Sequence, residues 1–465
     1  MKEKLPVGNF KEGKSMNTKL SIALACLLGA SPVFAQQKSM TLEERVAELE
    51  ASQSLNIFTF GGYLLTRYDG VNLKQSTPAA TALEATTEHW RLDTGFNINA
   101  NISNKIKFYS TVGMSKNFNA WNKQSSGVGS SPTFLPDATE SRSEQGSQAY
   151  VEKAYADYTF MPNTTLSFGR LPTMDGPPSE MSLGTARMGT YPSVGYNAPF
   201  DGLALSYNLP MDKQNLAIRV LYTPMTYMTT GAGKIGGAPE GLGNVTINGT
   251  KINSEVPFGA AMVEYGIDGT SIANKINLLV FAYQTGDLPL DGSTFNVGAG
   301  AGTGMVNFKV GGQVITAGFT GVAGTDLDLS LTYFQSKVEN SGTMTIPGLG
   351  PIYGFGATAD GDTLTGSTKL YSARYKWNNT FIGVEYLDGG KNVFNYDPAT
   401  EVVNGFYSTT GTGTHYYVTQ KLTPELGFRV GYMHQDYKST PFSFGASADT
   451  DRKIDTMYSS LRLDF

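Results

Sequence analysis

Cysteine is almost absent from this chain of 465 residues, in which the single Cys26 lies inside an apolar run near the N-terminus. One cysteine forms no internal disulfide, so such bonds do not hold this fold. Histidine is equally scarce, and His89, His415 and His434 are too scattered to predict a metal site. No apolar run approaches the length of a membrane-spanning helix.

The N-terminus predicts export. We assign residues 1–35 to a leader and signal peptide, with a positive start, an apolar run over 20–30 and a small-residue cleavage site ending at Ala35. The sequence leaves open whether translation begins at Met1 or at Met16.

The charge balance predicts no nucleic-acid partner. Cleavage after Ala35 removes five lysines and two acidic residues from 35 basic and 40 acidic residues, which leaves 30 against 38, a net charge of −8. An acidic chain without basic runs offers no surface for phosphates.

Residues 36–56 contain the one predicted helix. A Thr-x-x-Glu capping box opens it, and Leu42, Val46 and Leu49 follow coiled-coil spacing. We interpret this segment as a small periplasmic coiled coil that promotes oligomerisation. The alternative is a short solvated helix.

The last residues form the most informative pattern. Counting back from the chain end, Phe465, Leu463, Leu461 and Met457 place apolar side chains on one face of a strand. Chain ends usually fray, whereas an outer-membrane barrel uses such a strand to close itself. We expect the barrel-assembly machinery to recognise Phe465.

Alternation with period two continues from residue 57 to the end, most clearly over 90–102. Seven short and eight long gaps divide about sixteen strands, with fourteen or eighteen as alternatives. We therefore predict an all-β fold, a transmembrane antiparallel β-barrel over 57–465 with both ends in the periplasm. The predicted strands are 57–69, 88–102, 105–118, 149–161, 164–171, 200–209, 214–223, 257–268, 274–285, 303–319, 325–338, 367–378, 380–388, 409–421, 425–437 and 452–465.

These features together resemble the DcaP-like porins of Gram-negative bacteria. The match rests on the order of coil 41–50, barrel and terminal Phe465, on Phe-Gly-Gly-Tyr at 60–63 and on Phe-Gly-Arg-Leu-Pro at 168–172. The resemblance implies a sixteen-strand homotrimer that passes small anions, with dicarboxylates as the substrate class. Outer-membrane lipids and lipopolysaccharide are the expected surroundings.

Residues 172–199, the third long gap, are expected to form a constriction. In general porins the loop at this position folds into the lumen, and here it contains Asp175, Glu180 and Arg187 among prolines and glycines. An external lid is the alternative. Arg170 shares the parity of outward-facing residues, but it stands where the strand ends, so we include it among the constriction candidates.

Alternation also places charges on the lumen wall. Lys153, Arg219, Arg374 and Arg429 fall nearest mid-height, where fixed positive charge attracts anions, and Lys376 shares that inner face. The alternative is that such charges pair across the lumen and stiffen the wall. The other predicted wall charges are Arg67, Arg91, Lys107, Lys309, Asp69, Asp93, Asp157, Glu264, Asp326, Asp328 and Glu385.

We expect a passive porin without a catalytic, cofactor or metal site. Small hydrophilic solutes enter between the outer loops, pass the constriction and leave into the periplasm. Two other classes stay open. One is a structural or adhesive barrel without a useful pore. The other is an outer-membrane hydrolase, which needs a serine within hydrogen-bond reach of His415 or His434.

Overall fold

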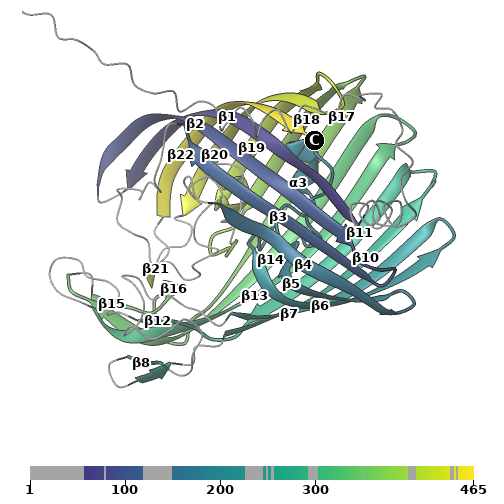
Figure 1. Ribbon diagram of the computed structural model, residues 1–465. Helices are drawn as coiled ribbons and strands as arrows, with labels where there is room; N and C mark the ends of the chain where they lie inside the picture. The colour runs from purple at the N-terminus through teal and green to yellow at the C-terminus, as the bar shows by residue number, and fades with distance from the viewer. Residues whose placement is uncertain are drawn as a thin grey trace, which may run out of the picture. The chain divides into compact units, whose positions relative to one another are not determined.

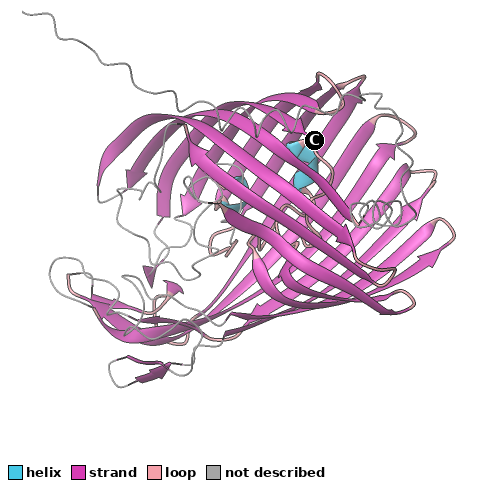
Figure 2. Ribbon diagram, in the orientation of Figure 1, coloured by secondary structure: helices cyan, strands magenta, loops and turns pink. Residues whose placement is uncertain are grey.

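A computed structural model of the chain describes residues 57–77, 80–118, 149–225, 245–247, 250–252, 256–291, 302–348, 350–395, 405–439, 445–446 and 449–465. The predicted leader and the predicted coil at 36–56 lie outside these residues. Almost all of the described chain is β-strand, as the magenta ribbons of Figure 2 show. No helix within these ranges is long and apolar enough to cross a membrane.

Sixteen antiparallel strands lie side by side in chain order and close into a barrel (Figure 1). Each strand pairs with its neighbours along the chain, which confirms the predicted fold class. The barrel strands are β1 (Phe58–Thr77), β2 (Ala80–Asn101), β3 (Ile106–Asn117), β4 (Tyr150–Met161), β5 (Thr164–Leu171), β6 (Phe200–Met211), β7 (Gln214–Met225), β10 (Val256–Asp268), β11 (Ala273–Thr285), β13 (Thr303–Val322), β14 (Leu327–Ile346), β17 (Thr363–Trp377), β18 (Thr380–Gly389), β19 (Gly411–Lys421), β20 (Leu426–Ser439) and β22 (Asp449–Asp464).

Short additional elements lie in the long connections. β12 and β15 extend the sheet beside β13 and β14, whereas β8 pairs with β9 and β16 with β21. Their bounds are β8 (Val245–Ile247), β9 (Thr250–Ile252), β12 (Leu288–Asp291), β15 (Gly350–Ile352), β16 (Phe355–Gly356), β21 (Gly445–Ala446), α3 (Ser179–Leu183) and η4 (Phe406–Ser408).

The last strand closes the barrel against the first. β22 pairs with β1 in antiparallel register from Tyr63↔Asp464 to Ser76↔Asp451. The terminal residue continues this ladder, because Gly62 N donates to Phe465 O at 2.7 Å and Phe465 N donates to Gly62 O at 3.0 Å. The alternating C-terminal pattern therefore belongs to a closing strand.

The first long gap is shorter than predicted. We expected a loop over 70–87, but β1 and β2 continue as a regular hairpin until Gln75↔Leu83. β14 also runs past its predicted end at residue 338 to Ile346, and it stays paired with β13 as far as Thr303↔Thr345. The sequence there resembles a loop because the exposed face is polar, whereas the inner face still buries Val71 of β1 and Met344 and Ile346 of β14.

The outer face of the barrel carries an apolar belt. On β6, Leu203 and Leu205 are 49% and 46% exposed, whereas Phe200 and Ala204, of the opposite parity, are buried. Exposed large side chains in regular alternation cost free energy in water and suit a lipid-facing wall. The strands therefore have the two faces of a membrane-spanning barrel.

Aromatic side chains border this belt at both ends. Phe60 stacks on Phe96 near the end of the short turns, and Trp90 contacts Tyr68 and Phe118 near the other end. Phe60 and Tyr68 are eight residues apart on β1, which is about 26 Å of strand at about 3.3 Å per residue. Because the strands of such barrels tilt by about 35–45°, this separates the two aromatic groups by about 20 Å along the barrel axis, near the apolar band of roughly 25 Å found in outer-membrane barrels.

Candidate functional site: the segment across the lumen

Residues 172–199, here called the crossing segment, connect β5 to β6 and carry the short helix α3. Gly184 ends α3 in the left-handed conformation, with φ 67°. A Cβ at Gly184 would lie 3.1 Å from the Thr419 side chain, on β19. Because β19 is far from β5 around the barrel, the segment reaches a distant part of the inner wall.

Two arginines of that distant wall hold the end of α3. Arg429 on β20 donates from Nη1 to Ser182 O at 2.7 Å, and Arg374 on β17 donates from Nη1 to Glu180 O at 3.3 Å and Met181 O at 3.4 Å. The last carbonyls of a helix carry partial negative charge and are incompletely paired, and here Gly184 N donates to Glu180 O at 3.2 Å. Guanidinium groups therefore satisfy them well.

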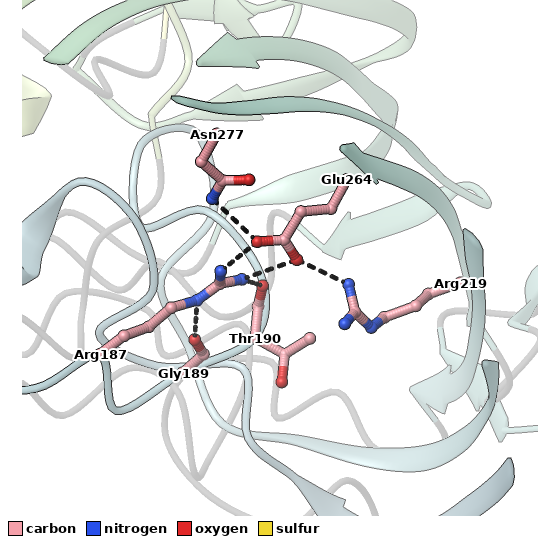
Figure 3. Close-up of polar contacts among 6 residues, drawn as sticks. All are labelled: Arg187, Gly189, Thr190, Arg219, Glu264 and Asn277. Carbon is pink, nitrogen blue, oxygen red and sulfur yellow. Dashed lines mark hydrogen bonds and ion pairs between the residues drawn. The ribbon is translucent and has the colours of Figure 1, made fainter. Parts of the chain in front are cut away.

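Glu264 of β10 binds the crossing segment to the near wall (Figure 3). Arg187 of the segment donates from Nη1 to Glu264 Oε1 and from Nη2 to Oε2, the latter at 3.4 Å. Arg219 of β7 donates to Oε2 at 2.8 Å, and Asn277 of β11 donates to Oε1 at 3.0 Å. One carboxylate thus receives two guanidinium groups, an arrangement much stronger than neutral hydrogen bonds.

Backbone carbonyls fix Arg187 from the other side. Its Nε donates to Gly189 O at 2.9 Å and its Nη2 donates to Thr190 O. The guanidinium therefore closes the segment on itself while it binds Glu264. Such double restraint limits the rotamers of a long side chain in a narrow passage.

The second half of the crossing segment packs on an apolar part of the inner wall. The ring of Tyr196 lies 4.9 Å from Phe200, 5.1 Å from Phe258 and 5.3 Å from Tyr283, centroid to centroid. Tyr283 also donates to Gly195 O at 3.2 Å. The lumen face is therefore not polar throughout, because the inner residues of β10, β11, β13 and β14 form a hydrophobic core with the segment.

The acidic residues of the segment have different roles. Asp175 is 5% exposed, has φ 54°, and its backbone N–H donates to Asn197 Oδ1 at 3.0 Å. Glu180 is largely buried, and its Oε2 meets no hydrogen-bond donor among the described residues. Burial raises the pKa of Glu180, and the charge of Glu264 adds to this, while the charges of Arg187 and Arg374 oppose it.

Two cavities flank the crossing segment. One of about 430 Å³ lies between its first residues and the inner faces of β1–β4 and the end of β22, and Lys153 and Asp175 line it. The other, of about 710 Å³, lies against β6–β17 and includes Glu180, Arg187 and Glu264. The segment thus borders two spaces that are each large enough for many water molecules and have charged linings.

A β-bulge adds a charge to the smaller cavity that alternation did not predict. Thr111 pairs with Lys153 and Val112 with Val151, so the strand holds one extra residue, Glu152. Glu152 is buried and accepts from Tyr63 OH at 2.8 Å. The only hint in the sequence is that Glu152 and Lys153 are consecutive charged residues, one of which regular alternation would place on the outer face.

The prediction for Arg170 is wrong. Arg170 donates to both carboxylate oxygens of Asp201, at 2.8 and 3.0 Å, and Asp201 is 62% exposed on the same face as Leu203. Arg170 therefore lies on the outer face, as its parity with Phe168 implies. Lys309 also faces outward, beside Asp287 at 3.5 Å, because the inner parity of β13 belongs to apolar residues.

The remaining predicted wall residues occupy different heights. Lys376 is exposed next to the short turn after β17, away from the crossing segment. Arg429 is 6% exposed and lies with its guanidinium carbon 5.3 Å from the Tyr458 ring. Arg67 and Arg91 both contact Asp69, at 2.8 and 3.1 Å, so this part of the wall is a buried ion-pair network.

A second inward connection was not predicted. Asn395, after β18, accepts from Gly195 N at 2.8 Å and donates to Tyr407 O. Tyr407 in turn donates to Glu385 Oε1 at 3.3 Å. The connection around η4 therefore lies against both the crossing segment and the wall.

The histidines show no hydrolase dyad in the described chain. His415 hydrogen-bonds to Glu385 at 2.7 Å and to the Tyr458 hydroxyl at 2.8 Å, and His434 to Asp455 at 2.8 Å. His89 lies outside the residues whose side chains are described. Within the described ranges no group of three His, Cys, Asp or Glu residues is placed to hold a metal ion.

Comparison with known proteins gives distant likenesses. The family described as "Protein of unknown function (DUF3373)" matches residues 86–222, and no curated protein matches the chain. A loop-deletion mutant of OmpT from Vibrio cholerae is 12% identical over 88% of this chain and 100% of its own, with a TM-score of 0.43. OmpF of Salmonella typhi, in a complex with daunomycin, is 12% identical over 88% of this chain and 97% of its own, with a TM-score of 0.43. A mutant porin of Rh. blastica is 11% identical over 88% of this chain and 100% of its own, with a TM-score of 0.39. At such low identity and TM-scores, the fold rests on the strand pairing itself.

Proposed function

We propose that this protein is an outer-membrane porin, a passive diffusion channel for small hydrophilic solutes. The observation that carries the proposal is the crossing segment, hydrogen-bonded to Arg374 and Arg429 on one wall and to Glu264 on the other. It narrows a sixteen-strand barrel but leaves two cavities with charged linings beside it, each large enough for many water molecules. A barrel of this strand number is wide enough for an aqueous channel.

The finer features of the proposal rest on the sequence. Small anions such as dicarboxylates are the solute class that the DcaP-like resemblance favours. A homotrimer, a periplasmic coil over 36–56, and assembly through Phe465 complete the proposed organisation. Lys153, Asp175, Glu180, Arg187, Arg219 and Arg374 are the proposed constriction residues, because they line the two cavities.

Conductance of the purified protein in a planar bilayer tests the proposal. We expect channel steps in groups of three, with a reversal potential under a salt gradient that reports anion preference. Single steps would exclude the trimer, and a cation bias would remove the dicarboxylate proposal. The absence of conductance would exclude the channel itself.

One observation favours the second candidate, a structural barrel without an open pore. Arg67, Asp69 and Arg91 are 1%, 0% and 3% exposed although they lie on the inner wall. A wall so well covered belongs to a filled part of the lumen. Deletion of residues 172–199 distinguishes the two candidates. It is expected to raise the conductance of a porin and to leave a closed barrel without conductance.

A further inference from the structure

The larger cavity has a nearly balanced charge, with five basic and four acidic side chains in its lining. Three of the bases are Arg187, which we expected in the constriction, and Arg219 and Arg374, which the sequence suggested as attractors of anions. Each of them pairs with a wall carboxylate. Arg374 contacts Asp328 at 2.8 Å, and the other two arginines share Glu264. A passing ion therefore meets each arginine together with the carboxylate that is paired with it.

Glu264 has the central position among these groups. It is 13% exposed, and Arg219 beside it is 18% exposed, so both charges lie at the cavity surface. The side chain of Arg219 hydrogen-bonds to Glu264 alone among the described residues. Loss of the Glu264 charge would remove the one carboxylate that Arg187 and Arg219 both contact (Figure 3).

We infer that Glu264 is the selectivity-determining residue of the channel, where it offsets one of two arginine charges and keeps the passage weakly selective. This inference rests on the proposed function. A fixed charge in a narrow, partly desolvated passage acts strongly on ions, because little water screens it. One carboxylate at this position therefore outweighs many charges on the rims.

Reversal potentials of three variants under a salt gradient test the inference. Glu264→Gln keeps the size and one acceptor oxygen, and we expect the anion-to-cation permeability ratio to rise about threefold or more. Arg219→Gln is expected to shift the ratio toward cations. The double variant, with the original net charge, is expected to return close to the wild-type value.

Two controls separate charge from anchoring. Glu264→Asp keeps the charge and is expected to keep the wild-type ratio, and Asp201→Asn makes the same chemical change on the outer face. A purely anchoring role of Glu264 would change conductance and noise without opposite shifts in Glu264→Gln and Arg219→Gln, and that result overturns the inference. If Glu264→Gln does not fold, the inference is tested by the permeability ratio of Arg219→Gln, which must shift toward cations; an unchanged ratio overturns it. Absence of wild-type conductance overturns the proposed function instead.

Discussion

The guanidinium of Arg429 donates a 2.7 Å hydrogen bond to the carbonyl oxygen of Ser182, a residue 247 positions earlier in the chain. With Arg374, it anchors the end of α3 to the wall opposite β5. These contacts connect a loop tip to strands that form near the C-terminus. The course of the crossing segment therefore depends on a complete barrel.

Replacement of both anchors is expected to release the tip of the crossing segment. In Arg374→Gln/Arg429→Gln, the bonds to the α3 carbonyls weaken, and hydrogen bonds to charged groups contribute about 1.5–3 kcal/mol each. We expect a larger and noisier single-channel conductance and faster tryptic cleavage after Arg187. Arg170→Gln, on the outer face, is the matched control. Wild-type cleavage and conductance in the double variant would contradict the anchoring role.

A methyl group at Gly176 is expected to disrupt the folded segment. A Cβ there would lie 1.6 Å from Tyr191 O, a backbone atom that cannot move without displacing the segment. Overpacking of this kind costs about 1–3 kcal/mol. We expect Gly176→Ala to lower the thermal midpoint and to expose Arg187 to trypsin. Gly259→Ala, with nothing within 4 Å of the new Cβ, is the control, and equal behaviour of the two variants would sink the prediction.

The buried carboxyl of Glu180 predicts a pH dependence. Because burial raises its pKa, the folded state holds the proton more tightly than the unfolded chain. This contribution is fully present below the ordinary carboxyl value of 4.5 and is lost as the pH rises through the raised pKa. We expect Glu180→Gln to match the wild-type thermal midpoint at low pH and to exceed it at neutral pH. A constant difference across this window would contradict the assignment, and Glu84→Gln, on an exposed side chain, is the control.

The seam between the first strand and the chain end predicts an assembly defect. A Cβ on Gly62 would lie 2.3 Å from Gly95 O and 2.9 Å from the Phe465 ring. We expect Gly62→Val to weaken barrel closure and to reduce the heat-modifiable, folded band on gels by at least about half. Gly266→Val, whose nearest neighbour is 4.0 Å away, is expected to fold normally. Normal folding of both variants would show that the seam tolerates displacement.

The barrel is predictable from the sequence alone. Alternation with period two is a local property, and short turns recur between the strands, so fifteen connections and a closing strand were readable before any contact was known. The same local alternation predicts the ends of β4 (Tyr150–Met161) and β5 (Thr164–Leu171), and both strands closely match the predicted segments. The unpredicted parts of the strands are the ends of hairpins such as β1–β2, where the exposed face changes from apolar to polar while Val71 and Leu73 remain on the inner face.

The charge pairs, in contrast, follow from the folded barrel and not from local sequence. Arg187 and Glu264 are 77 residues apart, and no periodicity relates a loop residue to a particular height on a distant strand. The bulge at Glu152 reverses the parity on which wall assignments depend, and Arg170 pairs outward because Asp201 lies opposite it. Alternation tells which face a side chain occupies. The stagger of the strands and the course of the crossing segment decide what it contacts there.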